Sequence, residues 1–321
     1  MLFLLVVLCF ETCSASVKSD NRFRDAVFIP HKGMALMNHV ISSHHVTSPI
    51  DCSFFCSSHD KCKSYNYKPR GAGDSDICQL NNATRRTNSA SYKPDAGFVH
   101  YFDQSESFKS CLDHFRNGAK ENGIYTITDI SGDSYPVFCD LTSEPRFAWT
   151  LILSQAFRNR NLAAFCSKPL PQNYPLNADS PNWEAYRLSL GRMQRLSQQS
   201  THVRVTTSFP EYNVEFRDYF RTKLSHFDIL SFYGSKSCFF MEIIDVRNHK
   251  GFNVTVGFWQ LEAEFLHTDT EHKTCQFDAS RGSLGSENNF GSYCQANCVN
   301  PVFRGCEKDD STTNYWFGGY M

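Results

Sequence analysis

Hydrophobic and polar residues alternate along many short stretches of the chain, a pattern typical of strands with one buried face. In the stretch FNVTVGFW (252–259), the even-numbered positions are apolar and share one face, which leaves Asn253 and Thr255 on the other. On such patterns we predict strands at residues 62–68, 77–81, 123–127, 135–140, 149–152, 201–209, 227–233, 238–246 and 252–259. Helical patterns are fewer, so the predicted fold class is α+β, built around an antiparallel sheet.

A short helix is predicted to begin at Ser48-Pro49-Ile50-Asp51. This stretch has a capping serine, a proline at the first helical position and an acid three residues after the cap. Cys52, Phe55 and Cys56 follow at the spacing of one buried helix face.

A second helix is predicted to begin at Ser180-Pro181. Its apolar residues fall on one face, and they are Trp183, Tyr186, Leu190, Met193 and Leu196. Arg187, Arg192 and Arg195 lie elsewhere on the same helix. We interpret them as a solvated helix face rather than as a binding patch.

The N-terminus has an apolar run from Leu2 to Phe10, followed by the small residues Ser14-Ala15-Ser16. This order is typical of a secretory signal peptide, here residues 1–16, followed by a lead at residues 17–27. A membrane anchor is the alternative, but a span needs about 20 apolar residues. We therefore expect a secreted protein without a membrane span. With a net charge of −1, the protein has no excess of positive charge that would attract nucleic acid.

Of the 14 cysteines, two lie in the predicted signal peptide, so an even number remains in the mature chain. No C-x2-C pair typical of zinc sites is present, so we expect disulfides. The cysteines form two groups, at 52–78 and 111–306, separated by the polar stretch 104–109, a predicted linker. Two glycosylation sequons, at Asn82 and Asn253, fit an extracellular location.

In the first group, two cysteines one helical turn apart can fasten the helix to the hairpin formed by the strands that follow. We therefore expect nested pairs, Cys52 with Cys78 and Cys56 with Cys62. Each bond contributes about 2–4 kcal/mol in a small domain. The spacing C-x3-C-x5-C-x-S-Y-N-Y, followed by C-x-L, resembles the PAN/apple module over residues 28–103. That resemblance implies a non-catalytic domain that binds proteins or carbohydrates.

Residues 110–321 resemble a divergent fibrinogen-like domain. The motifs that carry the resemblance are SC at 110–111, GIYTI at 123–127, PVFCDL at 136–141 and WT at 149–150. Cys111 and Cys139 bracket the first hairpin and are expected to pair. The family usually has glycines where this chain has Arg146, Phe147 and Ala148. The family's last strand is either missing here or replaced by NYWFGGYM at the end.

The stretch FLHTDTEHKTC (265–275) resembles the family's calcium loop, with Asp269 and Glu271 as the implied metal ligands. A polar turn held by a disulfide is the alternative, because Lys273 places a positive charge beside the acids. The resemblance also implies a ligand pocket in the segment 276–305. Its expected walls are Phe290, Tyr293 and Phe303.

The same resemblance implies a bond between Cys275 and Cys294. An extra bond between Cys298 and Cys306 then leaves Cys166 with Cys238. The pairing among these six cysteines stays open at this point.

The sequence contains none of the common hydrolase, nucleotide-binding or zinc-protease motifs, so we do not expect an enzyme. The adjacent His44 and His45 are interpreted as surface residues of a loop. The expected function is a secreted adhesive protein, lectin-like or protein-binding, with extracellular glycans or matrix proteins as partners. The alternative is a structural component of an extracellular or skeletal organic matrix. The domain order is similar to that of cnidarian matrix proteins of this kind.

Overall fold

The computed structural model describes residues 26–70, 75–85, 87–103, 107–129, 133–262, 264–269, 274–281, 290–291, 293–294 and 303–320. The predicted signal peptide, residues 1–16, lies outside this part of the chain. The chain divides into two compact units, of which the first ends at residue 106 and the second begins at residue 107. The division therefore falls within the predicted linker, 104–109. Among the described residues, no helix has the length and apolar character needed to cross a membrane.

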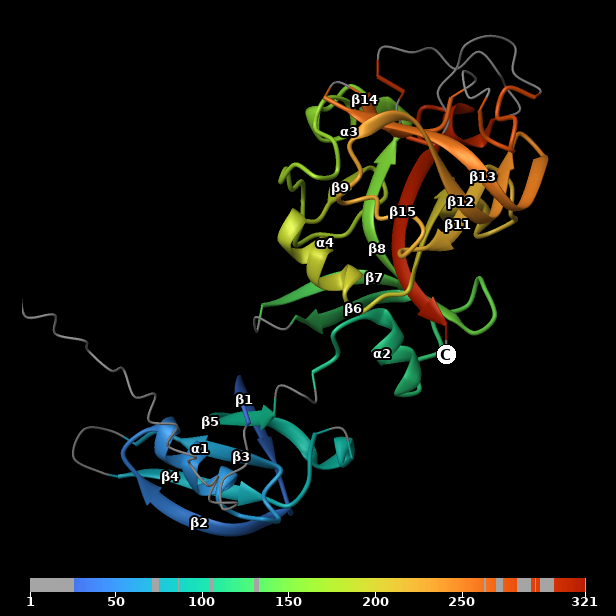
Figure 1. The fold of residues 1–321 in the computed structure, drawn as a ribbon. Helices are drawn as coiled ribbons and strands as arrows, with labels where there is room; N and C mark the ends of the chain where they lie inside the picture. The colour runs from blue at the N-terminus through green and yellow to red at the C-terminus, as the bar shows by residue number, and fades with distance from the viewer. Residues whose placement is uncertain are drawn as a thin grey trace, which may run out of the picture. The chain divides into compact units, whose positions relative to one another are not determined.

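The first unit is a five-stranded antiparallel sheet with one helix, drawn in blue to teal in Figure 1. Its elements are β1 (Phe28–Leu36), β2 (Val40–Val46), α1 (Pro49–Ser57), β3 (Ser64–Lys68), β4 (Asp76–Asn81), a short 3-10 helix (Ser89–Ser91) and β5 (Tyr92–Asp103). The strand order is β1-β5-β3-β4-β2. The predicted helix and the two strands after it are confirmed. Strands β1 and β5 were missed because each contains a proline and a glycine, which weaken the strand pattern.

Both disulfides predicted for this unit are confirmed, Cys52–Cys78 and Cys56–Cys62. All four cysteines are buried and form one cluster with Tyr65, Tyr67 and Leu80. The ring of Tyr65 also stacks on that of Tyr101 at 4.7 Å. The core of the first unit therefore consists largely of disulfides and tyrosines.

The second unit is built on a ten-stranded antiparallel sheet. Its strands are β6 (Gly123–Thr128), β7 (Ser134–Asp140), β8 (Phe147–Ala156), β9 (Ala185–Arg187), β10 (His202–Thr207), β11 (Tyr219–Lys223), β12 (Gly234–Val246), β13 (His249–Leu261), β14 (Glu264–His267) and β15 (Thr312–Tyr320). Its helices are α2 (Cys111–Arg116), α3 (Ala163–Cys166), α4 (Leu190–Ser197) and α5 (Phe209–Tyr212), with 3-10 turns at Phe157–Asn159 and Arg304–Cys306.

The last strand, β15, lies in the middle of this sheet, between β10 and β8. Figure 1 shows it in red beside β8. Its pairing with β8 runs from Thr312 opposite Ala156 to Tyr320 opposite Phe147. The segment NYWFGGY therefore supplies the returning strand that the sequence left in doubt, and Trp316 is fully buried there.

The helix predicted from Ser180 is wrong in its first half. Residues 185–187 form β9, which pairs with β8, and the helix α4 begins only at Leu190. The reason is the side chain of Asn182, whose Oδ1 accepts hydrogen bonds from the amides of Glu184 and Ala185 and holds a turn.

The strand predicted at residues 227–233 is also wrong, because this stretch forms successive turns. The Asp228 carboxylate accepts a hydrogen bond from the Leu230 amide at 3.0 Å, and its main-chain carbonyl accepts one from Phe232. Phe227 and Ile229 are buried nevertheless. The apolar pattern of this stretch therefore reflects packing in the core of the second unit rather than a strand.

The predicted solvated face of arginines is wrong for Arg187, which is fully buried. Its guanidinium donates hydrogen bonds to four main-chain carbonyls, those of Ala164, Lys168, Pro169 and Gln172. Arg192 forms ion pairs with Asp133 and Asp179, and Arg195 with Asp129. All three arginines therefore fix loops of the second unit.

The disulfide Cys111–Cys139 is confirmed, whereas two other implied pairs are wrong. Cys238 pairs with Cys275, and Cys166 pairs with Cys294. The main chain explains the first correction: the Phe277 amide donates to the Thr255 carbonyl at 2.9 Å, which brings the segment at 275 beside β13 and its neighbour β12. Cys306 is disulfide-bonded, but Cys298, its expected partner, lies outside the described residues.

Candidate binding site

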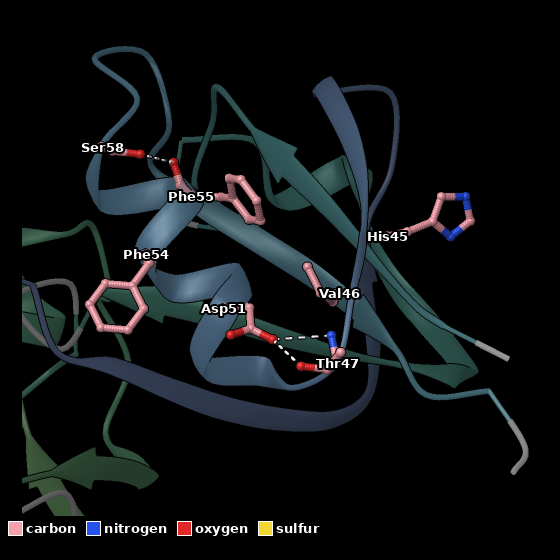
Figure 2. A pocket seen from close by; sticks show the side chains of 7 residues that line it. All are labelled: His45, Val46, Thr47, Asp51, Phe54, Phe55 and Ser58. Carbon is pink, nitrogen blue, oxygen red and sulfur yellow. Dashed lines mark hydrogen bonds between the residues drawn. The ribbon is translucent and has the colours of Figure 1, made fainter. Parts of the chain in front are cut away.

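The first unit carries a surface hollow of about 560 Å³ between the end of β2 and α1 (Figure 2). Its lining residues are His45, Val46, Thr47, Asp51, Phe54, Phe55 and Ser58. The hollow forms where the chain turns from strand into helix. Ser48 caps that helix by accepting a hydrogen bond from the Asp51 amide at 3.3 Å, so the cap also shapes the hollow.

Two adjacent phenylalanines of α1 give the hollow its apolar character. Phe54 is 60% exposed and Phe55 is 40% exposed. Phe55 was predicted on the buried face, and this prediction is wrong. The core-facing positions of this nine-residue helix belong to Cys52 and Cys56, whose disulfides anchor it to the strands. Figure 2 shows both phenylalanine side chains projecting from the helix.

His44 and His45 lie on strand β2, and their prediction as loop residues is wrong. The ring of His44 stacks on that of Phe55, with centroids 4.5 Å apart and planes 9° from parallel. Its Nε2 lies 3.0 Å from the Ser42 hydroxyl. His44 thus fixes the orientation of Phe55, and so one wall of the hollow.

The polar groups around the hollow are already hydrogen-bonded within the protein. The Asp51 carboxylate accepts from the Thr47 hydroxyl at 2.7 Å and from the Thr47 amide at 3.0 Å, as Figure 2 shows. These hydrogen bonds, the hydroxyl first, lower the pKa of Asp51. The Ser58 hydroxyl donates to the Phe55 carbonyl at 3.1 Å. The surface left for a ligand is therefore mainly apolar, with one negative charge at its edge.

A second hollow, of about 610 Å³, lies in the second unit. We call it the Trp183 hollow; it is lined by Gly123, Ile124, Phe138, Leu151, Pro181, Asn182, Trp183 and Glu184. It opens where β7 and β8 separate, since these strands pair only at Cys139–Thr150 and Asp140–Trp149. The Trp183 ring packs edge-on against Phe138 at 4.7 Å, and Glu184 at the rim forms an ion pair with Arg158.

The predicted calcium loop is only partly described. Phe265 lies on β14, Asp269 follows the strand, and Glu271 lies outside the described residues. Within the described part of the chain, no group of three or more His, Cys, Asp or Glu side chains is placed to hold a metal ion. The neighbouring His267 is buried, and this burial lowers its pKa.

The structure buries all three expected walls of the fibrinogen-like ligand pocket. Phe290 and Phe303 are fully buried and Tyr293 nearly so. The Phe303 ring packs against Phe290 at 6.1 Å and against Tyr293 at 6.0 Å. Rings that fill a core have no face left for a ligand, so their prediction as pocket walls is wrong.

Both sequon asparagines are exposed. Asn82 directly follows β4, and Asn253 lies within β13. Phe252, predicted on the buried face of that strand, is instead 61% exposed. The cause is the backbone of Asn253, whose φ of 53° interrupts the alternation of side chains.

Comparison with known families supports the identity of the first unit. Residues 26–105 match the family described as PAN domain. No curated protein matches the chain. The comparisons give no support for the fibrinogen-like resemblance or for a similarity to cnidarian proteins. PAN domains bind proteins or carbohydrates in extracellular proteins, and this match together with the disulfides points to an extracellular protein.

Sequence reasoning missed both hollows. The signal for the first is the pair Phe54-Phe55 between two half-cystines, since a short helix anchored at Cys52 and Cys56 cannot bury both rings. The signal for the Trp183 hollow is the pair Pro181-Asn182. These residues form a turn, so Trp183 is not part of the predicted helix.

Proposed function

We propose that this protein is a secreted adhesive protein of the extracellular matrix, which binds its partner through the hollow beside α1. Binding rather than catalysis is the proposed role. The observation that carries the proposal is the pair of exposed phenylalanines, Phe54 and Phe55, at a hollow of the PAN domain. Exposed apolar patches of this kind are typical of interaction sites.

A protein partner fits this hollow better than a glycan. The nearby Asp51 carboxylate and Ser58 hydroxyl already have partners within the unit, which leaves few groups for sugar hydroxyls. An apolar side chain of a partner would instead be buried against Phe54 and Phe55. Burial of such a side chain contributes about 1.5–3 kcal/mol.

The test compares Phe54→Ser with Val40→Ser, a matched control. Val40 is also an exposed apolar residue of the first unit, at 41%, but it does not line the hollow. We expect the wild-type protein to bind a surface of extracellular-matrix proteins saturably. Phe54→Ser should weaken this binding about tenfold, which corresponds to about 1.4 kcal/mol, and Val40→Ser should not change it.

Treatment of the matrix surface separates the partner classes. Protease treatment should abolish binding, whereas glycosidase treatment should leave it intact. Equal binding by Phe54→Ser and the wild type would show that the hollow is not the site, and loss of binding after glycosidase alone would show a glycan partner.

For the second unit we propose a divergent fibrinogen-like domain with lectin-like binding as a second function. Residues 123–127, 136–140 and 149–150 of these motifs lie on β6, β7 and β8, and the sheet takes in a returning last strand, β15. The observation that favours sugar binding is the Trp183 hollow. A partly exposed tryptophan offers a flat face to a sugar ring, and the Glu184–Arg158 pair offers hydrogen-bonding groups at the rim.

Tryptophan fluorescence tests this second function. Trp149 and Trp316 are fully buried and Trp259 is 6% exposed, so external quenchers should act mainly on Trp183. We expect at least one of the neutral disaccharides lactose, cellobiose and chitobiose to protect Trp183 from acrylamide. Trp183→Phe should remove the quenchable signal. If none of these sugars protects Trp183 at millimolar concentration, the lectin-like proposal fails.

A structural role in the matrix is the remaining alternative. It is favoured by Ile50 and Phe54, which lie one helical turn apart on α1 and are 65% and 60% exposed. Such a face could hold copies of the chain together. Concentration-dependent self-association in sedimentation experiments, lost in Phe54→Ser, would favour this role over binding to a different partner.

We also propose that the loop after β14 binds calcium through Asp269 and Glu271. The proposal rests on the resemblance of the stretch 265–275 to a calcium loop. A bound ion there would have a structural role, because the Cys238–Cys275 bond fixes the far end of the loop to β12.

A further inference from the structure

An exposed aromatic ring and a glycosylation sequon lie side by side on the outer face of β13. Phe252 is 61% exposed, one of the most exposed large apolar residues in the described part of the chain. The next residue, Asn253, is also exposed and begins the sequon Asn253-Val254-Thr255. Neither feature is used by the two hollows or by the calcium loop.

The backbone explains why two consecutive side chains point outward. In a regular strand, Phe252 and Asn253 would lie on opposite faces. Asn253 has a φ of 53°, in the left-handed region, which asparagine tolerates better than most residues. As a result, the residues on either side, Gly251 and Val254, both face inward. A β-carbon at position 251 would lie 2.8 Å from Val254 Cγ2 and 2.6 Å from the Phe277 ring.

The strand pairing holds this arrangement in place. Gly251 pairs with Ile244 of β12, Phe252 with Ile243, and Val254 with Met241. On the other edge, the Thr255 carbonyl accepts a hydrogen bond from the Phe277 amide at 2.9 Å. The Phe252 ring is therefore presented beside the Asn253 side chain by a strand that is fixed on both edges.

We propose that Asn253 carries an N-linked glycan whose first N-acetylglucosamine packs on the ring of Phe252 and stabilises the β12–β13 hairpin. The inference rests on the proposed secretion, since a chain must enter the secretory pathway to meet the transferase. The C–H groups on one face of the sugar ring carry partial positive charge and are attracted to the negative face of the phenyl ring. The contact also removes exposed apolar surface of Phe252 from water.

The covalent step joins Asn253 Nδ2 to C1 of the sugar of a lipid-pyrophosphate oligosaccharide. The C1–O bond to the pyrophosphate breaks, and the lipid pyrophosphate leaves with the bonding electron pair. The amide nitrogen loses one proton. No oxidation or reduction takes place.

The chain contains a matched control in its other sequon. Asn82 is exposed, but the nearby apolar side chains Leu80 and Ala83 are 1% and 6% exposed. A sugar on Asn82 therefore has no aromatic ring of a sequence neighbour to cover. Its removal should not change the stability of the protein.

The test uses the full chain secreted from a eukaryotic host that adds high-mannose glycans, with occupancy of both asparagines read by mass spectrometry. One sample is trimmed by endoglycosidase H, which leaves the first N-acetylglucosamine. Another is treated with an amidase that removes the whole glycan. Both are applied to Asn82→Gln, so that only the glycan on Asn253 changes.

We expect trimming to leave the melting temperature of the second unit unchanged and complete removal to lower it by about 2–4 °C. In Phe252→Ser, which removes the ring, complete removal should have no such effect. The comparison of the two backgrounds cancels effects of the altered asparagine itself.

Two outcomes separate this inference from the proposed secretion. If the full chain, expressed with its own N-terminal segment, does not reach the medium, the proposed secretion fails and the inference fails with it. If the secreted chain carries no glycan on Asn253, or if complete removal has the same effect in Phe252→Ser as in its parent, the inference alone is overturned.

Discussion

At the scale of single residues, the second unit contains a buried carboxylate, that of Asp218, whose ion pair with Arg217 is long, at 3.8 Å from Nε to Oδ2. Asp218 is fully buried, and its carboxylate accepts hydrogen bonds from the amides of Arg247 at 2.6 Å and Arg304 at 3.0 Å. Burial, together with the nearby Asp245, raises the pKa of Asp218 to about 6 despite these hydrogen bonds. Asp218 therefore joins the β12–β13 turn to the segment before β15. Its ionised form is destabilised by burial away from water, which lowers the stability of the folded protein.

This shift predicts a pH dependence of stability. The folded-state pKa of Asp218 lies above its unfolded value of about 3.9, so its contribution to stability grows as the pH falls through 6. Buried histidines such as His100 and His267, whose pKa values are lowered, act in the opposite direction. We therefore expect the pH effect in the difference between wild type and Asp218→Asn. As the pH falls from 7 to 4.5, the free energy of unfolding of the wild type, measured with urea, should rise by about 2 kcal/mol relative to that of Asp218→Asn. A difference independent of pH would contradict the assignment.

At the scale of elements, prediction succeeded where local chemistry and tertiary structure agree. The helix α1 could be predicted because its cap, its proline and its paired cysteines all lie in nine consecutive residues. The strand β9 could not be predicted, because apolar spacing around Tyr186 fits a helix, and only the turn at Asn182 and pairing with β8 decide otherwise. The exposed Phe252 could not be predicted either, since one left-handed asparagine reversed the expected face.

The loop after β14 gives a prediction at this same scale. If Asp269 and Glu271 bind calcium, the ion stabilises the native state, because it binds the folded loop in preference to the unfolded chain. Millimolar calcium should then raise the melting temperature of the second unit by a few degrees relative to chelator. Asp269→Ala should remove this shift while the protein still folds, and magnesium at the same concentration serves as the control ion. Identical melting of the wild type in calcium and in chelator would contradict the calcium site and favour the alternative, a polar turn.

At the scale of the whole molecule, the sequence predicted the two-unit organisation and the antiparallel sheets, but not their topology. The cysteine groups and the polar stretch at 104–109 indicated the division near residue 106. Pairings such as Cys166–Cys294 could not be derived, because they join segments that only the finished sheet brings together. The candidate hollow beside α1 was missed for a related reason. Its walls, His45 and Phe54, come from different elements.

The central position of β15 has a consequence for the synthesis of the protein on the ribosome. Strands β8 and β10 both bond to β15, which follows all other strands in the chain. At about 5–20 residues per second, β8 emerges on the order of ten seconds before the strand that it pairs with. The second unit therefore cannot complete its sheet until β15 has been synthesised, and the inner edges of β8 and β10 stay open to wrong partners during that interval. All five strands of the first unit precede every strand of the second unit in the chain, so the nascent chain is expected to carry a finished N-terminal domain ahead of an unfinished one.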